Sequence, residues 1–545
     1  MKRKWLPEIV FFLIVLLVFI VNSSYVSYPD EFVNLLGGKF INAGKIPYKE
    51  FFDHHLPFAW YFAAVLLKFS FGSFILFRLY WAIFIFVLLA ILGLWIRKNY
   101  KNLYPYYLVF FLLHPLVSIY FWLHLYLADN LATLLFIMVF WLLFPQTIEG
   151  KINYKVILIS SFLTFSLIFS SLTFVYLALT LYVWQFHLLL RAKIRIKNIV
   201  FFILFNLAPY LIYILYLLIT SSLSDFLFAN FTYNTKLYID IPNYTLGRFF
   251  NPLKFGFTLI FNFWEGFLPR LATIRDLNLY LPVATLTVLG NITLLILLTL
   301  KNIFGGFIFF FLLSFSAPRS NLQKAMFETD YQVGLFIVLG IAASIFAIYL
   351  LRKLEVKDVL INDFRRLGQL LISVLLLFTF LFLLKNTYDK WYLRYTQKIP
   401  SIFDKADVAQ FLDEILDEGD YYWVGPYEPH EVFFVKKGRL PGKYAVLLPQ
   451  YKQSEYLKKT FIEQFEKHLP MVIVFKKDTG IFGTPTYLFG DFFLAWMKDK
   501  YTPLEDIKDI KILKDPTSVK LDSHLYLLNS EKDKLLRRLK THGYI

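Results

Sequence analysis

The sequence predicts an α-helical polytopic membrane protein of about eleven transmembrane helices, with a small soluble α/β domain at the C-terminus. Three observations support this fold class. The 545 residues are 58% hydrophobic, the apolar residues form long blocks such as the one after Glu8, and Lys and Arg cluster between the blocks. Soluble proteins average roughly 45–50% apolar residues, whereas a spanning helix needs about 20 in succession. The excess of apolar residues is therefore typical of a chain that crosses a bilayer.

Charge and cysteine content exclude other classes. The net charge of +17 would also suit nucleic acid, but short basic clusters between apolar blocks are the pattern of cytoplasmic loops. We therefore expect no nucleic-acid partner. The chain has no cysteine, which excludes disulfides and thiolate metal sites.

The apolar blocks define the spans. The first block follows Lys2, Arg3 and Lys4 and has no clear cleavage site, so it is interpreted as a retained signal anchor. We expect spans at residues 6–26, 75–96, 103–121, 127–145, 155–171, 173–190, 198–220, 279–300, 303–317, 331–351 and 368–386. Basic residues follow the even-numbered spans, which predicts that the N-terminus and these loops face the cytoplasm.

The same charge pattern assigns the remaining segments to the outer side. These are residues 27–74, 122–126, 221–278, 318–330 and everything after about 387. Two alternatives would reverse the side of the C-terminus: one long kinked helix over 155–190, or an additional span at 254–270. The loop charges argue against both.

The first outer segment has helical patterns. Asp30 to Ala43 reads as an amphipathic helix that ends at Gly44. Leu56 to Phe71 reads as a second helix, with Pro57 in its first turn. It is too short and too interrupted for a span, so we expect it along the membrane surface.

The chain divides near residue 386 into a transmembrane domain, 1–386, and an extracytoplasmic α/β domain, 387–545. In the second part charges become frequent and helical patterns alternate with short apolar strands. We expect helices at 403–417, 453–468 and 529–541, and strands at 421–425, 444–449 and 471–475. Strands separated by helices favour a partly parallel sheet.

Ionisable residues gather near the outer ends of the predicted spans, where they are functional candidates. This set comprises Asp30, Glu31, Lys39, Asp53, His54, His55, Lys68, Arg78, His124, Asp129, Arg319, Lys324, Glu328 and Asp330. We expect many of them to converge on one outward-facing cavity.

The order of motifs in residues 28–79 resembles the first extracytoplasmic region of GT-C glycosyltransferases. The similarity is to the bacterial relatives of the protein O-mannosyltransferases and the aminoarabinose transferase. The matching features are an acidic pair after the first span, a Gly-x-x-Pro-Tyr turn, a Phe-x-x-His-x-Pro-like segment and a Phe-Gly…Arg-Leu entry into the second span. They correspond here to Asp30-Glu31, Gly44 to Tyr48, Phe51 to Pro57, and Phe71-Gly72 with Arg78-Leu79. An acidic residue, Asp129, also stands at the outer start of the fourth span. The resemblance covers roughly residues 5–200.

The resemblance implies transfer of a monosaccharide from a polyprenyl-phosphate carrier to a glycolipid, glycan or protein, on the outer face of the cytoplasmic membrane. Such a reaction needs a carboxylate to accept the proton of the acceptor hydroxyl and cations to stabilise the leaving phosphate. The carboxylate candidates are Asp30, Asp129 and Glu31; the candidates for binding the carrier phosphate are Arg78, Arg319, Lys324 and His55. Adjacent helical residues do not face each other, so one of Asp30 and Glu31 is expected in the cavity, and the family pattern selects Asp30. The metal and the cofactor are unknown, with a divalent cation left open. Membrane lipids are the other expected partners.

Structural interpretations compete with each role. Asp30 and Asp129 are suited to the first turn of a helix, where a carboxylate meets unpaired N–H groups. Arg78 is suited to extend its guanidinium to the lipid headgroups. For the adjacent pair His54-His55, packing at the interface is favoured over shared ligation of a metal. The alternative functions are a transporter or lipid flippase, which would place its charges near the bilayer midplane, and an inactive scaffold member of the family.

Overall fold

A computed structural model describes residues 6–238, 281–317, 331–354, 359–396, 406–507, 510–515 and 521–545. It divides into two compact units. The helical unit comprises the described parts of Met1–Tyr25, Ser73–Tyr213 and Thr245–Ile399. The mixed unit comprises the described parts of Val26–Gly72, Ile214–Tyr244 and Pro400–Ile545. Three segments far apart in the sequence therefore build the mixed unit.

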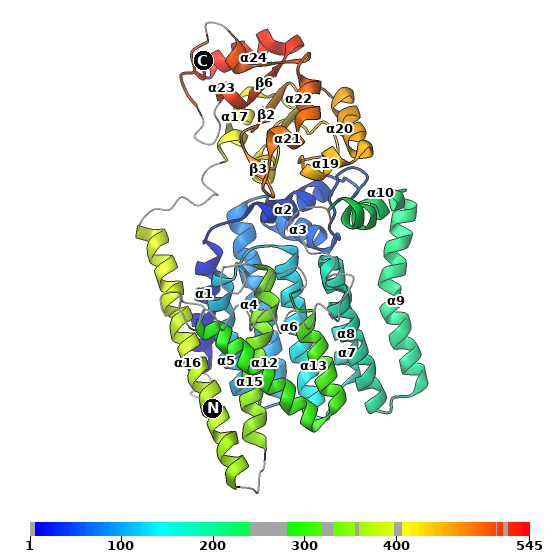
Figure 1. The fold of residues 1–545 in the computed structure, drawn as a ribbon, viewed down its shortest axis with the longest axis vertical. Helices are drawn as coiled ribbons and strands as arrows, with labels where there is room; N and C mark the ends of the chain where they lie inside the picture. The colour runs from blue at the N-terminus through cyan, green and yellow to red at the C-terminus, as the bar shows by residue number, and fades with distance from the viewer. Residues whose placement is uncertain are drawn as a thin grey trace. The chain divides into compact units, whose positions relative to one another are not determined.

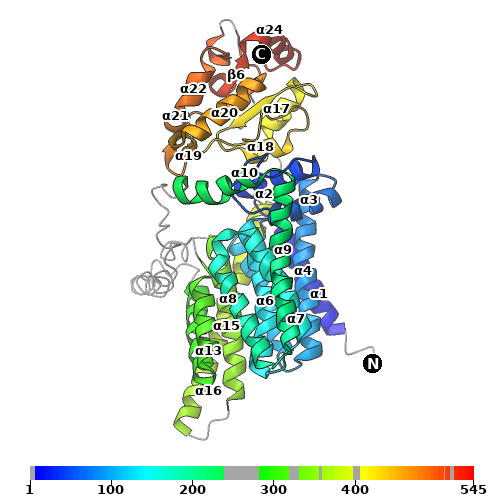
Figure 2. The same cartoon turned by 90° about the vertical axis from the view of Figure 1, so that its right-hand side faces the viewer.

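Long helices that run roughly side by side form the helical unit (Figures 1 and 2). They are α1 (Leu6–Ser23), α4 (Phe74–Asn99), α5 (Tyr104–Tyr120), α6 (Ala128–Glu149), α7 (Tyr154–Ser170), α8 (Val175–Arg191), α9 (Ile196–Ile219, which continues into the mixed unit), α12 (Leu281–Lys301), α13 (Ile303–Ser314), α15 (Gly334–Lys353) and α16 (Val359–Thr396). Helices α6 and α15 are buried over most of their length, as expected of helices that are apolar on all sides. They are the centre of the bundle.

Seven helices of the described residues are long and apolar enough to cross a membrane, rather than the eleven predicted. They are Leu6–Ser23, Phe74–Asn99, Ala128–Glu149, Leu172–Arg191 (α8 with the short 3₁₀ turn before it), Ile196–Ile219, Tyr331–Lys353 and Leu360–Thr396. The spans predicted at 103–121, 155–171, 279–300 and 303–317 correspond to the shorter apolar helices Tyr104–Tyr120, Tyr154–Ser170, Thr285–Lys301 and Ile303–Ser314. At about 1.5 Å per residue, the helices of 17 and 12 residues are shorter than the hydrocarbon core of about 30 Å. Helix α12 has 21 residues in all. The sequence pattern located these helices and overstated the lengths of those predicted at 103–121 and 303–317.

The C-terminal ends of several helices meet at one basic end of the helical unit. Lys353, in the last turn of α15, lies 2.5 Å from Glu149 at the end of α6. Lys301, at the end of α12, donates to the carbonyl of Ile148 at 3.1 Å. Arg97, near the end of α4, pairs at 2.7 Å with Glu8 in the first turn of α1. The loop charges that predicted the topology are thus close together in space.

The mixed unit contains a four-stranded sheet with short helices around it. Its elements are α2 (Pro29–Asn42), α3 (Phe58–Phe69), α10 (Leu223–Leu227), the π-helix η3 (Phe228–Leu237), α17 (Asp407–Ile415), β1 (Tyr422–Gly425), α18 (Pro429–Phe434), α19 (Pro449–Gln453), α20 (Glu455–Lys467), β2 (Val472–Phe475), the two-residue strands β3 (Gly480–Ile481) and β4 (Thr484–Pro485), α21 (Thr486–Phe489), α22 (Asp491–Met497), β5 (Tyr501–Pro503), α23 (Leu521–His524), β6 (Leu525–Leu528) and α24 (Lys532–Thr541). The strand order is β1-β2-β6-β5. β1 and β2 are parallel, with Trp423 beside Ile473, and the other two pairings are antiparallel.

Most of the predicted elements of this unit are confirmed. Helices α2 and α3 match the two predicted in the first outer segment, and the strands predicted at 421–425 and 471–475 are β1 and β2. The strand predicted at 444–449 was wrong, because this apolar run is a buried loop. Its carbonyl at Tyr444 accepts from the Trp423 indole at 3.2 Å, and the amide of Leu447 donates to Pro426 at 2.8 Å. Strand β6 was not predicted.

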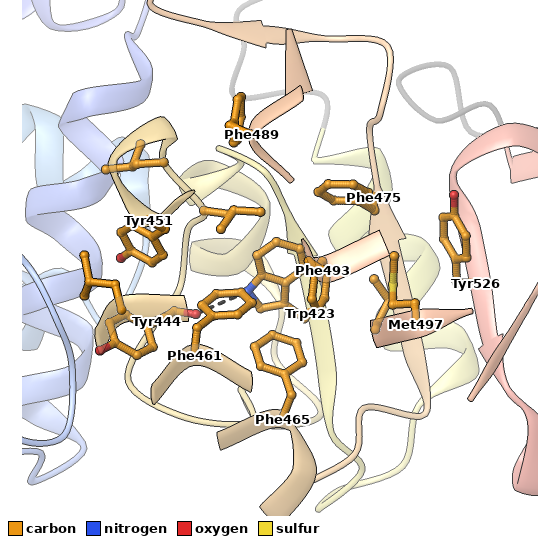
Figure 3. Packing of buried hydrophobic residues seen from close by; sticks show 14 of the residues in the cluster. Trp423, Tyr444, Tyr451, Phe461, Phe465, Phe475, Phe489, Phe493, Met497 and Tyr526 are labelled. Atoms are coloured by element: carbon orange, nitrogen blue, oxygen red, sulfur yellow. Dashed lines mark hydrogen bonds between the residues drawn. The ribbon is translucent and has the colours of Figure 1, made fainter. Parts of the chain in front are cut away.

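An aromatic cluster fills the space between the sheet and helices α20 and α22. Figure 3 shows Trp423 of β1 among Phe461, Phe465 and Phe493, with Tyr444 and Tyr451 at one side. Tyr233 of η3 is part of the same buried cluster, and Phe52 of the first outer segment packs against it. Burial of apolar surface in this cluster therefore holds the three segments of the mixed unit together.

Candidate active site

Asp30 lies in the first turn of α2, next to a tyrosine from the C-terminal segment. The helix starts at Pro29, with Tyr28 as an N-cap residue that makes no side-chain capping bond. The hydroxyl of Tyr427 donates a hydrogen bond of 2.8 Å to Asp30 Oδ1. A carboxylate at a helix N-terminus is favoured by the helix dipole, and the Tyr427 bond fixes the direction of this one.

Glu31, the neighbour of Asp30, has a different environment. Its side chain is fully buried, at 0% exposure, whereas Asp30 is partly exposed. A carboxylate can accept a proton from a substrate only if the substrate can reach it. The two acidic residues therefore differ in accessibility, and Asp30 is the accessible one.

The segment from Tyr48 to Pro57 is held by contacts on several sides. Tyr48 has a φ of 66°, a left-handed conformation that is uncommon outside glycine, and its hydroxyl donates to the carbonyl of His55 at 2.9 Å. The amide of Phe52 donates to Lys443 O at 2.8 Å, and the Asn234 side chain donates to His54 O at 3.0 Å. These bonds tie residues 52–55 to two other segments of the mixed unit.

Asp53, His54 and His55 form a compact cluster within this segment. Asp53 Oδ1 lies 2.6 Å from Nδ1 of His55 and 3.7 Å from Nδ1 of His54, and it accepts from the backbone N–H of His55 at 3.1 Å. Burial opposes ionisation of Asp53, but the charge and hydrogen bond of His55, together with the charge of His54, outweigh it and hold the pKa of Asp53 below its usual value. The cluster therefore presents an ionised carboxylate beside two imidazoles.

The cluster and Tyr427 line the same pocket, whose volume is about 70 Å³. Its walls come from α2, from residues 51–55 and from the C-terminal segment. The lining residues are Val33, Leu36, Gly37, Phe40, Phe51, Phe52, Asp53, His54, His55, Tyr427, Pro429, Ala445, Val446, Leu448 and Tyr451. At roughly 10–15 Å³ of such volume for one water molecule, the pocket accommodates an ion with a few waters.

Lys39 binds the end of α18, the helix that contributes Pro429 to the pocket lining. Its ammonium donates to the carbonyls of Phe433 and Val435 at 2.8 Å each, and to that of Val432 at 3.4 Å. It thereby satisfies carbonyls at the C-terminal end of α18, where a helix leaves them without partners. Burial lowers the pKa of Lys39 to about 8, although the nearby Asp413 opposes this shift.

The helical unit contains the other described candidates. Arg78, near the start of α4, is 2% exposed and donates to the carbonyls of His124 at 3.1 Å and Tyr25 at 3.3 Å. It is buried against the backbone, which differs from the expected extension to the headgroups. Asp129, in the first turn of α6, is 4% exposed. Lys390 of α16 lies over the ring of Tyr25 at 5.3 Å.

The structure thus distributes the predicted site residues over two units. Asp30, Glu31 and His55 belong to the mixed unit; Arg78 and Asp129 belong to the helical unit. Arg319 and Lys324 lie outside the described residues. Within the mixed unit the structure brings Asp30 and His55 to one neighbourhood, since Tyr427 contacts the first and lines a pocket with the second.

Sequence reasoning missed Tyr427 as a site residue. Tyr427 follows β1 in the Gly425-Pro426-Tyr427 stretch, where residues after a strand often carry function, but nothing in the pattern pairs it with Asp30. Lys390 was placed beyond the last span, whereas α16 continues to Thr396. In comparisons with known proteins, no family model matches this chain, and no curated protein matches it in sequence.

Proposed function

We propose that this protein is a multi-pass membrane glycosyltransferase of GT-C type, which moves a monosaccharide from a polyprenyl-phosphate carrier to an acceptor hydroxyl. The observation that carries the proposal is Asp30: a partly exposed carboxylate at a helix N-terminus, oriented by Tyr427. It stands in the segment whose order of motifs resembles that family.

In the proposed reaction the acceptor oxygen attacks the anomeric carbon of the donor sugar. The bond between that carbon and the carrier phosphate breaks, and the phosphate leaves with its electron pair. The acceptor proton passes to the carboxylate of Asp30, which acts as general base. The Tyr427 hydroxyl donates a hydrogen bond to one carboxylate oxygen of Asp30 and so orients the group.

Cationic side chains would stabilise the leaving phosphate. Arg319 and Lys324 keep this proposed role. Arg78 donates to two backbone carbonyls, so its bonds favour positioning of the segments at Tyr25 and His124. Asp129, in the helical unit, keeps only the role that the resemblance implies.

The proposed site is on the outer face of the cytoplasmic membrane. The basic side chains of Lys301, Lys353 and Arg97 gather at one end of the helical unit, and such an end faces the cytoplasm by the positive-inside rule. Asp129 and Lys390 lie near the opposite helix ends.

The decisive test replaces Asp30 with Asn. The change preserves shape and the capacity to sit in a first helical turn, but it removes the basic carboxylate. In proteoliposomes with a polyprenyl-phosphate sugar donor, Asp30→Asn is expected to lower the transfer rate by about a hundredfold or more. Asp491→Asn, an exposed residue of the same unit paired with Lys452, is the matched control and is expected to be active.

The alternative outcomes separate the hypotheses. Near-normal activity of Asp30→Asn together with an inactive Glu31→Gln would assign the base to Glu31. If both variants transfer sugar normally, this segment has no catalytic role. If the wild-type protein transfers no sugar but moves a lipid across the vesicle membrane, the flippase alternative replaces the enzyme.

A further inference from the structure

The side chains of Asp53, His54 and His55 offer one carboxylate oxygen and two imidazole nitrogens within a small volume. One ligand atom from each residue lies within 4.8 Å of those of the other two. Carboxylate and imidazole together are ligands that Zn²⁺ and related divalent transition metals accept. We propose that these three residues bind one such ion, independently of any sugar transfer.

The local backbone removes the usual objection to adjacent histidines. In a strand or a helix, neighbouring side chains point in different directions. Here the two residues form a turn in which Asp53 accepts the amide of His55, an Asx turn. The two imidazole centroids are 4.2 Å apart, with the rings inclined at 37°. Both Nδ1 atoms consequently lie on the side of Asp53.

The two distances to Asp53 Oδ1 require only a small adjustment. Two ligands of a tetrahedral zinc ion, each bound at about 2.0–2.1 Å, are roughly 3.3 Å apart. The separation of 3.7 Å between His54 Nδ1 and Asp53 Oδ1 is close to this value, and that of 2.6 Å to His55 must open by about 0.7 Å.

A second observation points to a ligand in the pocket. The hydroxyls of Tyr451 and Tyr233 are fully buried and have no hydrogen-bond partner among the described residues. Tyr451 lines the pocket together with the cluster, and the ring of Tyr233 lies 5.3 Å from that of His54. A buried hydroxyl without a hydrogen-bond partner destabilises a fold, so a polar occupant of the pocket would satisfy these groups.

Metal-bound water is such an occupant. The O–H group of each phenol can form a hydrogen bond with such a water. Three protein ligands leave a fourth position of the ion for water. A pocket of about 70 Å³ holds the ion and its water, whereas a whole sugar ligand needs a site of roughly 300 Å³ or more.

The experiment measures metal binding by the full-length protein. Wild-type protein stripped with a chelator is titrated with Co²⁺ and Zn²⁺, and X-ray absorption of the zinc form identifies the ligands. We expect one equivalent per chain, an absorption fine structure with two imidazoles, and a Co²⁺ spectrum of four-coordinate type. Asp53→Asn and His54→Ala should each weaken binding by about a hundredfold or more, and Tyr451→Phe, which changes only the surrounding of the ion, by about tenfold.

His468→Ala is the matched control, because this histidine of the same unit stacks on Tyr421 away from the cluster. It should bind the metal as the wild type does. Absence of a bound equivalent in the wild type, or a zinc environment without imidazole, would overturn the proposal. Both readouts use the wild-type chain, so a variant that fails to fold does not affect them.

Discussion

Replacement of Lys39 with Met tests whether the buried ammonium holds α18 in place. Two of its hydrogen bonds to helix carbonyls are 2.8 Å long, and the third, at 3.4 Å, is disregarded. Hydrogen bonds of charged groups contribute about 1.5–3 kcal/mol each; the lower value applies, since burial of the ammonium is costly. The expected loss is therefore about 3 kcal/mol, with side-chain volume nearly unchanged.

The effect should be local. A loss of about 3 kcal/mol corresponds to a roughly hundredfold rise in the population of the opened segment. Amide hydrogen exchange of the full-length protein in lipid nanodiscs measures this: amides of residues 429–435 should lose about two orders of magnitude of protection. Lys437→Met, an exposed lysine close to the same helix, is the control. Protection equal to the wild type in Lys39→Met would refute the assigned role of this residue.

Three other predictions follow from the same unit and from the topology. Tyr427→Phe removes the hydrogen bond to Asp30 and should lower the sugar-transfer rate about tenfold, whereas the exposed Tyr487→Phe should not; equal rates for the two variants would separate Tyr427 from the reaction. The pKa of Lys39 is about 8 in the folded protein and about 10.4 in the unfolded chain, so the unfolded chain binds more protons between these values and the free energy of unfolding should rise with pH there. Between pH 7.5 and pH 9.5, thermal melts should therefore show a larger rise in stability for the wild type than for Lys39→Met. An identical rise in both proteins would contradict the lowered pKa of Lys39. A C-terminal alkaline phosphatase fusion should be active and a C-terminal fluorescent protein fusion dark, and the reverse pattern would place the mixed unit in the cytoplasm.

The sequence predicted the helices well because apolar length is a strong signal. Every predicted span coincides with a helix, and the amphipathic segment from Asp30 ends one residue before Ala43. Spanning length was harder to predict. Tyr104–Tyr120 and Ile303–Ser314 belong to apolar stretches, but Pro105 lies at the start of the first helix and Asn302 caps the second. Capping fixes helix ends within a residue or two, whereas hydropathy averages across them.

The apolar run at 444–449 shows where pattern reasoning fails. Its composition suits a strand, yet Tyr444 and Leu447 are buried in the aromatic cluster without a strand partner. A short apolar run indicates burial and does not reveal what covers it. In this case the covering residues, Phe52 and Tyr233, lie about 400 and about 200 residues before this run in the sequence. No local pattern reveals contacts over such separations.

The same long-range pairing explains why the candidate site was predicted only in part. Asp30 and His55 were predicted from the sequence around them, but the side chains that orient or surround them come from the C-terminal segment. Tyr427 orients Asp30, and Tyr451 lines the pocket of the histidines.

The C-terminal segment is therefore more than an appended soluble domain, since it supplies a wall of the candidate site. Phe52 of the first outer segment packs against Tyr444 and Tyr451, so removal of that segment would uncover part of this aromatic face. Burial of one such aromatic side chain stabilises a fold by about 1.5–3 kcal/mol, which is a large fraction of the stability of a domain. It follows that the first outer segment and the C-terminal segment depend on each other for stability.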